Sequence, residues 1–500
     1  MVVKLTRQVL LEYVRKEDLT VPQAIRVVQD LLFNTSNLLY NLNLPLKPLS
    51  LTLNPNPSSD LNILLSFLDE QPSTKFLRLS YLDFTATPRV RVVPVKHALT
   101  LLRNRGSLKI GITKACLGLL QNDTFIPGVT AAGEYRLHAI FSSIRPGPSE
   151  NYASLQCEFL EQDNSGVAIC PRSLLRRTVQ NAKAQELEFL LGFEIEVVFM
   201  SPAHDGQHKF VANSSSAGHA WNSARAFQEK AFLPILDEIY GTLTLSGIHL
   251  ELFHPESSAG QYEFVLPALP PVEAVDTLLH AREIISTVAA SHSLRATLFP
   301  KPFPLESGTA SHVHISISSP KGDDREVYES FYAGVLRHLR AIIAFTYSNP
   351  ASYDRMVDGC WAGGRWVTWG TQNREAALRK IAGSHWEVKV LDGLANAYLA
   401  MASIIAAGTD GVARSEPLIW RDCTKDPATL SAEERTSLGI GEELPRDLFA
   451  AIEALAEDEI LRDMLGNEVL QRYISVKMAE VKLLDTMADH DRRDWIIDRY

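Results

Sequence analysis

Cysteine is scarce in this sequence, with five residues in 500 and no Cys-x-x-Cys pair. An odd, scattered set predicts neither a disulfide framework nor a zinc ribbon, and it favours a reducing compartment. Long apolar runs are also missing, because the longest, 397–407, is too short to span a bilayer. The first 16 residues carry charges among their apolar side chains and lead to no small-residue cleavage site. We therefore expect a cytoplasmic protein with no membrane partner.

Positive charge is in deficit, since the formal net charge is −10. A protein that binds the phosphate backbone of nucleic acid normally presents basic surface, so no nucleic-acid partner is expected. A pocket for a single nucleotide stays open, because it needs only a few arginines. Hydrophobic residues at 46% and charged residues at 22% are typical of a globular protein. The length exceeds what one hydrophobic core accommodates, which predicts more than one domain.

The order of helical and strand patterns predicts an α+β protein in three parts. Residues 1–69 predict a helical extension, with two helices over 3–43, and a linker rich in Pro, Asn and Ser. Residues 70–165 predict a small mixed domain, because strand-like runs recur at 76–84, 89–94, 107–112 and 134–141. Residues 166–500 alternate helices, among them 272–292 and 328–346, with further strands and form the larger part.

Acidic side chains gather on two predicted strand segments. In 191–199, Glu194 and Glu196 share one face while apolar residues fill the other. In 247–263, a turn at Ala259-Gly260 brings Glu256 close to Glu263. Carboxylates placed this close repel each other unless a cation lies between them. The first pair indicates a cation site; for the second stretch taken alone, a solvated hairpin is the competing interpretation.

Histidines follow the same alternating pattern in a third segment, 308–317. His312, His314 and Ser316 lie on one face of this predicted strand. A single histidine is usually structural, but two on one face, beside paired glutamates elsewhere, favour a metal or phosphate site. A fourth strand, 386–390, places Glu387 and Lys389 on one face.

These segments, in this order, resemble the motifs of glutamine synthetase, and most closely those of the FluG-type fungal branch of its type I enzymes. The resemblance covers roughly residues 70–500. It rests on Gly192-Phe-Glu-Ile-Glu196, His254-Pro-Glu-Ser-Ser-Ala-Gly-Gln-Tyr-Glu263, Lys301-Pro302, Ser311-His-Val-His-Ile-Ser316, Ser352-Tyr-Asp-Arg355, Asn373-Arg374, Arg379, Glu387 and residues 395–411.

The resemblance implies a glutamine synthetase-like fold with a small β-grasp-like domain and a catalytic domain built on a curved antiparallel sheet. It implies two or three Mg²⁺ or Mn²⁺ ions, because oxygen ligands with one imidazole suit these cations. The ligands implied are Glu196, Glu256 and Glu263 for one ion, and Glu194, His312 and Glu387 for another. The implied catalytic residues are Arg355, Arg374 and Arg379.

The resemblance also implies how substrates bind. His314, Ser316, Arg374 and Arg379 would contact the nucleotide ATP. Gly308, Arg355, Trp361 and Lys389 would contact the other substrates, with Arg355 gripping a carboxylate as a fork. The implied activity is that of an ATP-dependent carbon–nitrogen ligase of the EC 6.3.1 class. It transfers a phosphoryl group to a carboxylic acid, and an amine then displaces phosphate to form an amide.

Three departures from the family pattern affect the acid and amine ends of this site. Gly359-Cys-Trp361 stands where the family carries a glutamate, Lys389 replaces a second arginine, and Ser307 replaces an asparagine. No convincing match appears for the loop that supplies the ammonium-binding aspartate. An aromatic at the amine position favours an amine bulkier than ammonium, so a carboxylate–amine ligase is the leading interpretation.

Two other functions remain open from the sequence: glutamine synthetase proper, acting on glutamate and ammonium, and a non-catalytic relative serving as a regulatory or scaffold protein. The family implies a homo-oligomer, with a dodecamer of two hexameric rings as its type I form. The partners expected are therefore a carboxylic acid, an amine and further copies of the chain.

Overall fold

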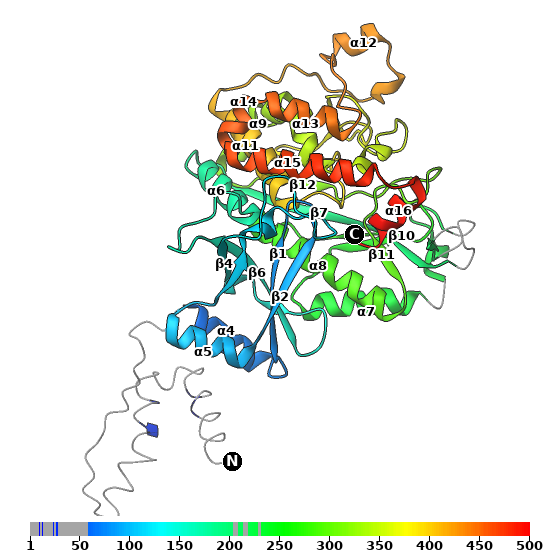
Figure 1. The fold of residues 1–500 in the computed structure, drawn as a ribbon. Coiled ribbons are helices and arrows are strands. Elements are labelled where there is room, and N and C mark those ends of the chain that lie inside the picture. The colour runs from blue at the N-terminus through cyan, green and yellow to red at the C-terminus, as the bar shows by residue number, and fades with distance from the viewer. Residues whose placement is uncertain are drawn as a thin grey trace, which may run out of the picture. The chain divides into compact units, whose positions relative to one another are not determined.

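The computed structural model describes residues 59–203, 209–213, 219–228 and 232–500, together with Leu10, Tyr13, Ala24, Val27 and Val28. The chain divides into two units, Met1–Pro57 and Ser58–Tyr500. Most of the helices predicted over 3–43 and of the linker lie outside the described residues. The domain boundaries at 69 and 165 stay predictions. All that follows concerns the second unit (Figure 1).

A small sheet forms the first part of this unit, with strand order β2-β1-β6-β4-β3 and β5 paired to β6. Apolar residues alternate along the first half of β1, so Leu77 and Leu79 are buried on one face of the sheet. The elements are α4 (Ser59–Glu70), β1 (Phe76–Leu82), β2 (Pro88–Pro94), α5 (Val95–Arg105), β3 (Lys109–Thr113), β4 (Glu134–Ala139), β5 (Arg145–Pro146) and β6 (Tyr152–Leu160).

A larger sheet carries the residues of interest, in the order β13-β14-β15-β12-β7-β10-β9, with β8 and β11 also paired to β7. Every pairing in it is antiparallel except that of β13 with β14. Its strands are β7 (Phe189–Pro202), β8 (Phe210–Ala212), β9 (Leu252–Pro255), β10 (Gln261–Val265), β11 (Arg295–Thr297), β12 (Val313–Ile317), β13 (Trp369–Thr371), β14 (Leu378–Ala382) and β15 (His385–Val388).

Helices surround the large sheet. The Ala-rich α11 (Ala397–Ala413) is buried along most of its length and packs against α9 and α6, because its small side chains allow close approach. The long α8 lies across β7, and Figure 1 shows it beside α7. The others are α6 (Pro171–Lys183), α7 (Leu233–Leu245), α8 (Pro271–Ser291), α9 (Arg325–Arg337), α10 (Leu339–Thr346), α12 (Ala432–Ser437), α13 (Leu448–Glu457), α14 (Glu459–Leu465), α15 (Asn467–Leu484) and α16 (Asp489–Ile497).

The structure differs from the sequence predictions at several elements. A single helix expected from Tyr328 to Thr346 is two helices, α9 and α10, that meet at His338. The strand expected over 308–317 is regular only from Val313. Among the described residues, no helix is long and apolar enough to cross a membrane.

Candidate active site

Four strands of the large sheet bring the predicted acids and histidines together. β7 supplies Glu194 and Glu196, and β10 supplies Glu263, which lies directly opposite Glu196 in the antiparallel register. β12 and β15 place His314 opposite Glu387. Like charges directly across a strand pair are destabilising, so the Glu196–Glu263 register needs a compensating partner.

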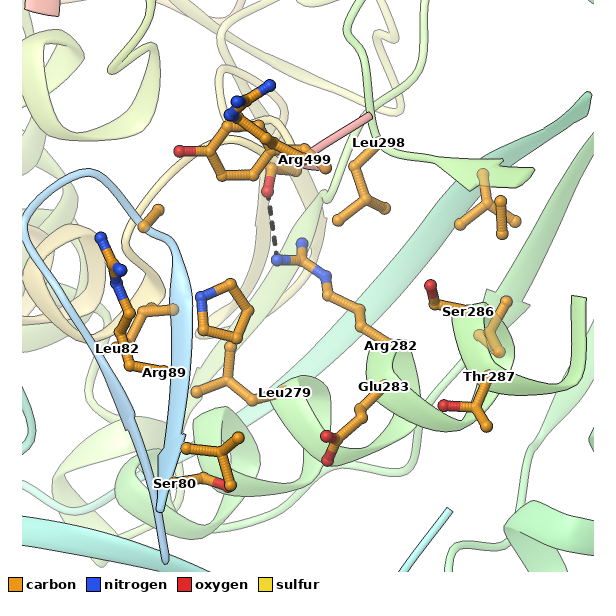
Figure 2. Close-up of a pocket in the computed structure, with 18 of the residues that line it drawn as sticks. Ser80, Leu82, Arg89, Leu279, Arg282, Glu283, Ser286, Thr287, Leu298 and Arg499 are labelled. Atoms are coloured by element: carbon orange, nitrogen blue, oxygen red, sulfur yellow. Dashed lines mark hydrogen bonds between the residues drawn. The ribbon is translucent and has the colours of Figure 1, made fainter. Parts of the chain in front are cut away.

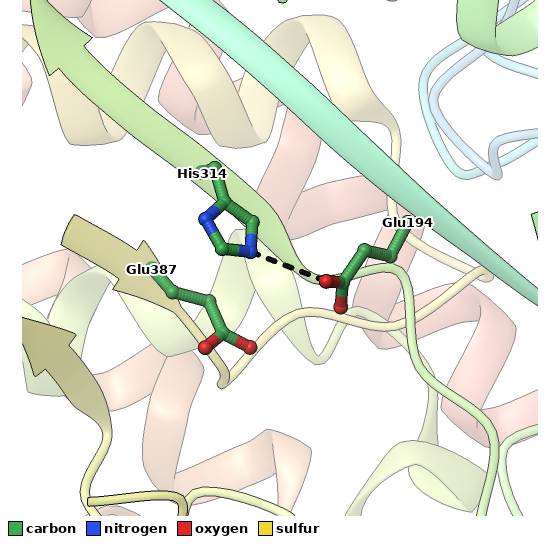
Figure 3. A group of neighbouring side chains, drawn as sticks. All are labelled: Glu194, His314 and Glu387. Atoms are coloured by element: carbon green, nitrogen blue, oxygen red, sulfur yellow. Dashed lines mark hydrogen bonds and ion pairs between the residues drawn. The ribbon is translucent and has the colours of Figure 1, made fainter. Parts of the chain in front are cut away.

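One cluster joins Glu194, His314 and Glu387, which point toward a common centre from three strands (Figure 3). One potential ligand atom from each lies within 4.8 Å of the others. His314 Nε2 lies 3.2 Å from Glu194 Oε1, and His314 Nδ1 lies 2.8 Å from His385 Nε2. The resemblance implied that His314 contacts the nucleotide. In the structure it lies beside Glu194 and Glu387, two of the predicted metal ligands.

A second cluster joins His254, Glu256 and Glu263, again with potential ligand atoms within 4.8 Å of one another. His254 Nε2 lies 3.2 Å from Glu263 Oε1, and its Nδ1 lies 3.6 Å from Glu256 Oε1. Sequence reasoning gave His254 no role. The sequence contained a signal for this residue. A hairpin that turns at Ala259-Gly260 pairs β9 with β10 and places His254 opposite Glu263.

His312 lies beside the first cluster, and Glu196 lies near it and opposite Glu263 of the second cluster. His312 Nδ1 is 3.0 Å from Glu194, 3.6 Å from Glu196 and 3.4 Å from Glu387. Glu196 Oε2 accepts hydrogen bonds from Gln261 Nε2 at 2.8 Å and from the backbone of Ala310 at 3.0 Å. All six predicted ligands therefore converge, while their division between ions stays a prediction.

The electrostatics of the clusters indicate missing positive charge. Burial and the neighbouring charge of Glu263 raise the pKa of Glu256 to about 7. Burial, with the charges of Glu256 and Glu263, raises the pKa of Glu196 well above its usual range. Burial opposes ionisation of Glu387, but the charges of Lys389 and His312 lower its pKa to about 2. Burial also opposes ionisation of Glu194, but hydrogen bonds with His312 and His314 outweigh it and lower the pKa of this carboxyl well below its usual range. The missing positive charge is therefore at Glu196 and Glu256.

The donor set fits divalent cations. Within the described part of the chain, neither Lys nor Arg forms an ion pair with Glu194, Glu196, Glu256 or Glu263. Carboxylate oxygens with imidazole nitrogens suit Mg²⁺ or Mn²⁺. Several buried carboxylates without a positively charged partner would be strongly unfavourable.

Both clusters face a cavity of about 610 Å³. Arg355, Arg374, Arg379 and Lys389 line the same cavity. Arg355 is buried and donates from Nη1 to Tyr347 Oη at 2.5 Å, while its Nε has no partner. Arg379 pairs with Glu387 at 3.0 Å, and Lys389 pairs with the same carboxylate at 3.1 Å. Of the predicted site residues, Ser316 and Glu387 are not among those lining the cavity; Glu387 lies just behind it in the first cluster.

Aromatic side chains form another part of the cavity wall. Trp221 and Trp361 contact each other edge to face, with ring centroids 5.6 Å apart, and both are about half exposed. Gly308 also lines the cavity, where a Cβ would lie 2.5 Å from the carbonyl oxygen of Pro300. Trp221 was missed from the sequence because it follows a polar loop with no periodic pattern.

Comparisons with known proteins define the class of this fold and site. A solved structure described as a GmaS/ADP complex superposes with a TM-score of 0.74 at 22% identity, covering 87% of this chain and 99% of the other. One described as a novel glutamine synthase homolog superposes with a TM-score of 0.71 at 25% identity, covering 85% and 99%. The fold is therefore glutamine synthetase-like, as the sequence predicted.

The family model for the glutamine synthetase catalytic domain matches residues 168–500. The chain belongs to the glutamine synthetase family, whose members use ATP and divalent metal ions and commonly form oligomers.

Two relatives show to which branch of the family the chain is similar. Protein fluG of Emericella nidulans is 42% identical over 99% of this chain, which spans 57% of the length of that protein. Gamma-glutamylpolyamine synthetase GlnA3 of Streptomyces coelicolor is 31% identical over 82% of this chain and 90% of its own length. The predicted resemblance to the FluG-type branch is confirmed.

Proposed function

We propose that this protein is an ATP-dependent carboxylate–amine ligase that joins a carboxylic acid to an amine larger than ammonium through an acyl-phosphate intermediate. The observation that carries the proposal is one cavity that contains two acid–imidazole clusters together with Arg355, Arg374 and Arg379. Such a cavity combines cation sites with groups that bind phosphate and carboxylate oxygens.

In this reaction, Arg374 and Arg379 would bind the phosphates of ATP, and Arg355 would orient the acid. Glu196, Glu256 and Glu263, with His254 beside them, would hold one Mg²⁺ or Mn²⁺. Glu194, His312 and Glu387, with His314 beside them, would hold another. These ions, when bound, neutralise negative charge on the transferred phosphoryl group. The carboxylate takes the γ-phosphoryl group, ADP leaves, the amine attacks the acyl carbon, and phosphate departs as the amine loses a proton.

The amine end of the cavity supports a substrate larger than ammonium. Trp361 stands where the family carries a glutamate, and Trp221 packs against it. Indole rings offer apolar surface and a π face that attracts an alkylammonium group. The similarity to a gamma-glutamylpolyamine synthetase points in the same direction. A polyamine is thus the first amine to test.

The decisive assay measures ADP release from the full chain with Mg²⁺, ATP and a panel of acids and amines, with mass spectrometry of the products. We expect release that requires both an acid and an amine, and an amide among the products. ADP release indifferent to every acid and amine would refute the proposal.

Glu194→Ala tests the metal cluster within the same assay. We expect its turnover to fall by at least about a thousandfold, because one cation would lose a charged ligand. The negative charge of the transferred phosphoryl group would then be less well neutralised. Glu453→Gln, an exposed change on α13, should leave turnover unchanged. Circular dichroism should show that both variants keep the fold. A Glu194→Ala enzyme with wild-type turnover would exclude this cluster from catalysis.

Two alternatives have direct tests. Glutamine synthetase proper predicts glutamine from glutamate, ammonium and ATP, and the replacement of a family arginine by Lys389 disfavours it because the bidentate fork is lost. A scaffold protein predicts no ATP binding in the presence of Mn²⁺ by calorimetry. The buried acids disfavour a scaffold, since a non-catalytic protein gains nothing from retaining them.

The proposal extends to assembly and location. A homo-oligomer, in the type I form a dodecamer of two hexameric rings, is expected from the family, and light scattering measures its mass. A cytoplasmic location agrees with the free thiols of all five cysteines.

A further inference from the structure

A second cavity, of about 250 Å³, lies apart from the candidate active site. It lies between the small sheet and α8, with the C-terminal Arg499 and Tyr500 among its lining residues. Figure 2 shows Arg282 extending from α8 toward its centre, with Arg499 on one side and Leu279 and Leu298 nearby. No lining residue of this cavity lines the active-site cavity.

Five arginines line this cavity, and most have acidic partners. Arg78 pairs with Glu283, Arg89 pairs with Asp83 and Asp123, and Arg295 lies 3.7 Å from Asp498. Arg282 and Arg499 differ, because neither forms an ion pair within the described residues. Arg499 lies over the Trp495 ring, 3.2 Å from its centroid, and donates from Nη1 to the Trp495 carbonyl oxygen at 3.0 Å. Both guanidinium groups therefore lack an acidic partner among the described residues, but only that of Arg282 is without an aromatic contact as well.

Arg282 is the more unusual of the two. Its Nη1 donates to the carbonyl oxygen of Gly393 at 3.3 Å and its Nη2 to Ser311 Oγ at 2.7 Å, whereas its buried Nε has no acceptor. Burial lowers its pKa to about 10, and Asp392 is the acid whose charge opposes this shift. A guanidinium has five N–H donors, so the half-buried Arg282 keeps unused Nη donors beside the cavity, whereas its Nε is enclosed by protein.

The rest of the lining adds apolar surface and hydroxyl groups. Leu82, Leu279 and Leu298 contribute apolar surface, and Ser80, Ser286 and Thr287 contribute hydroxyl groups. Pockets for drug-sized ligands measure roughly 300–1,000 Å³, so a cavity of about 250 Å³ suits a smaller molecule. An anionic head with a short aliphatic body matches this lining.

We propose that this cavity is a binding site for a small organic anion, with its carboxylate or phosphate against Arg282 and Arg499 and its aliphatic body between Leu279 and Leu298. Guanidinium groups bind both kinds of anion through paired hydrogen bonds. Arg282 also holds Ser311, which lies between Ala310 and His312 of the candidate active site. The site is thus adjacent to, and separate from, the proposed chemistry.

Calorimetry on the full chain tests the site with three matched probes: 4-methylpentanoate, 3-methylbutyl phosphate and the neutral 4-methylpentanamide. We expect one or both anions to bind at one site per chain and the amide to bind at least about tenfold more weakly, because it lacks the charge-assisted hydrogen bonds. The tighter of the two anions identifies carboxylate or phosphate as the preferred head group. Failure of both anions to bind, or equal binding of the amide, would overturn the proposal.

Variants separate this site from the active site. Arg282→Gln and Arg499→Gln should each weaken anion binding at least about tenfold, and Ser286→Leu should do the same by filling the cavity without changing charge. Arg325→Gln, on the exposed face of α9, removes the same charge and should bind as wild type. Arg355→Gln removes the proposed carboxylate fork of the active site and should also retain binding.

Two results would contradict the assignment: anion binding that survives both Arg282→Gln and Ser286→Leu, or binding abolished by Arg355→Gln. Thermal unfolding checks the fold of each variant. If Arg282→Gln does not fold, Ser286→Leu and Arg499→Gln show whether the anion binds in this cavity. Because Arg355 belongs only to the active site, loss of the ligase activity would leave the expected binding results unchanged.

Discussion

A single carboxylate fixes the loop that carries Trp361. Glu375 Oε1 accepts a hydrogen bond from the backbone N–H of Trp361 at 2.8 Å, and Oε2 accepts one from Gly359 at 3.3 Å. Trp361 itself has a φ of +57°, a conformation that is uncommon for a residue with a side chain. Glu375 thus compensates for local backbone strain, and it directly follows Arg374 of the cavity wall.

Glu375→Ala should therefore release this loop. We expect the KM for the amine to rise about tenfold, with a smaller change in the KM for ATP, because two charge-assisted hydrogen bonds are lost at the amine end. Glu375→Gln keeps one acceptor oxygen and should recover part of the loss. Tryptophan fluorescence should change in the alanine variant without substrate. An equal rise in both KM values would show a general structural defect instead.

His280 gives the fold a defined sensitivity to acid. It is buried on α8, where its Nε2 lies 2.9 Å from the carbonyl oxygen of Pro146, and burial lowers its pKa to about 4. The unfolded chain has an ordinary histidine pKa of about 6.5 and therefore binds this proton more readily. Between these two values, the free energy of unfolding should decrease as pH falls.

The size of this effect is at most about 3 kcal/mol, the equivalent of the shift from 6.5 to about 4. His280→Gln keeps an N–H donor and does not titrate. Urea unfolding at pH 7.5 and pH 4.5 should show a smaller loss of stability in His280→Gln than in the wild type. The interpretation fails if the two proteins lose the same amount.

At the scale of elements, the turn between β9 and β10 sets the spacing of the second cluster. Gly260 has a φ of +73°, and a Cβ there would lie 2.7 Å from the carbonyl oxygen of Phe199 on β7. Only glycine satisfies both conditions without movement of the backbone. This turn presents Glu256 and Glu263 to the same centre.

Gly260→Ala should destabilise the fold by about 2–4 kcal/mol, because the unfavourable φ adds to a steric overlap. Gly383→Ala is the matched control, since Gly383 has a φ of +52° with open space around its Cβ position. It should cost only about 1–2 kcal/mol. Chemical denaturation measures both. Equal losses would show that the close approach to Phe199 has no energetic consequence.

Elements with strong periodicity could be predicted from the sequence. The alternation of Phe193, Ile195 and Val197 predicted β7, and helical spacing predicted α8 almost to its ends. The strand β6 was missed although Leu155, Cys157 and Phe159 alternate with Gln156 and Glu158, so the sequence did carry a signal for it. The break at His338 was missed because Leu336, Leu339 and Ile342 continue the apolar pattern across it.

Convergence of the site residues could be predicted, but their grouping could not. Motif order placed Glu194, Glu263 and His312 in one site. The register between strands decides which imidazole faces which acid, and it brings His314 of β12 to Glu387 of β15. Register depends on turns and sheet pairing far apart in the sequence, so local patterns carry little information about it.

For the whole molecule, the buried acids make stability depend on bound cations. A ligand that binds only the folded state raises the free energy of unfolding by about 2.7 kcal/mol at a concentration of 100 Kd. With an unfolding entropy of about 2.1 cal/mol/K per residue, a chain of 500 residues should gain roughly 3 °C in Tm. Mn²⁺ should therefore raise the Tm, and a chelator should reverse the rise.

Glu256→Gln provides the sharpest test of this dependence. Without divalent cations, this variant should melt above the wild type, because one carboxylate of the Glu256–Glu263 pair is replaced by a neutral group of the same shape. With Mn²⁺ in excess, the order should reverse, since the wild type gains a cation and the variant has lost a ligand. Glu453→Gln should follow the wild type in both conditions. Calorimetric scans that place Glu256→Gln below the wild type without metal would mean that the buried charges are satisfied by the protein alone, and the argument for a cation at this cluster would fail.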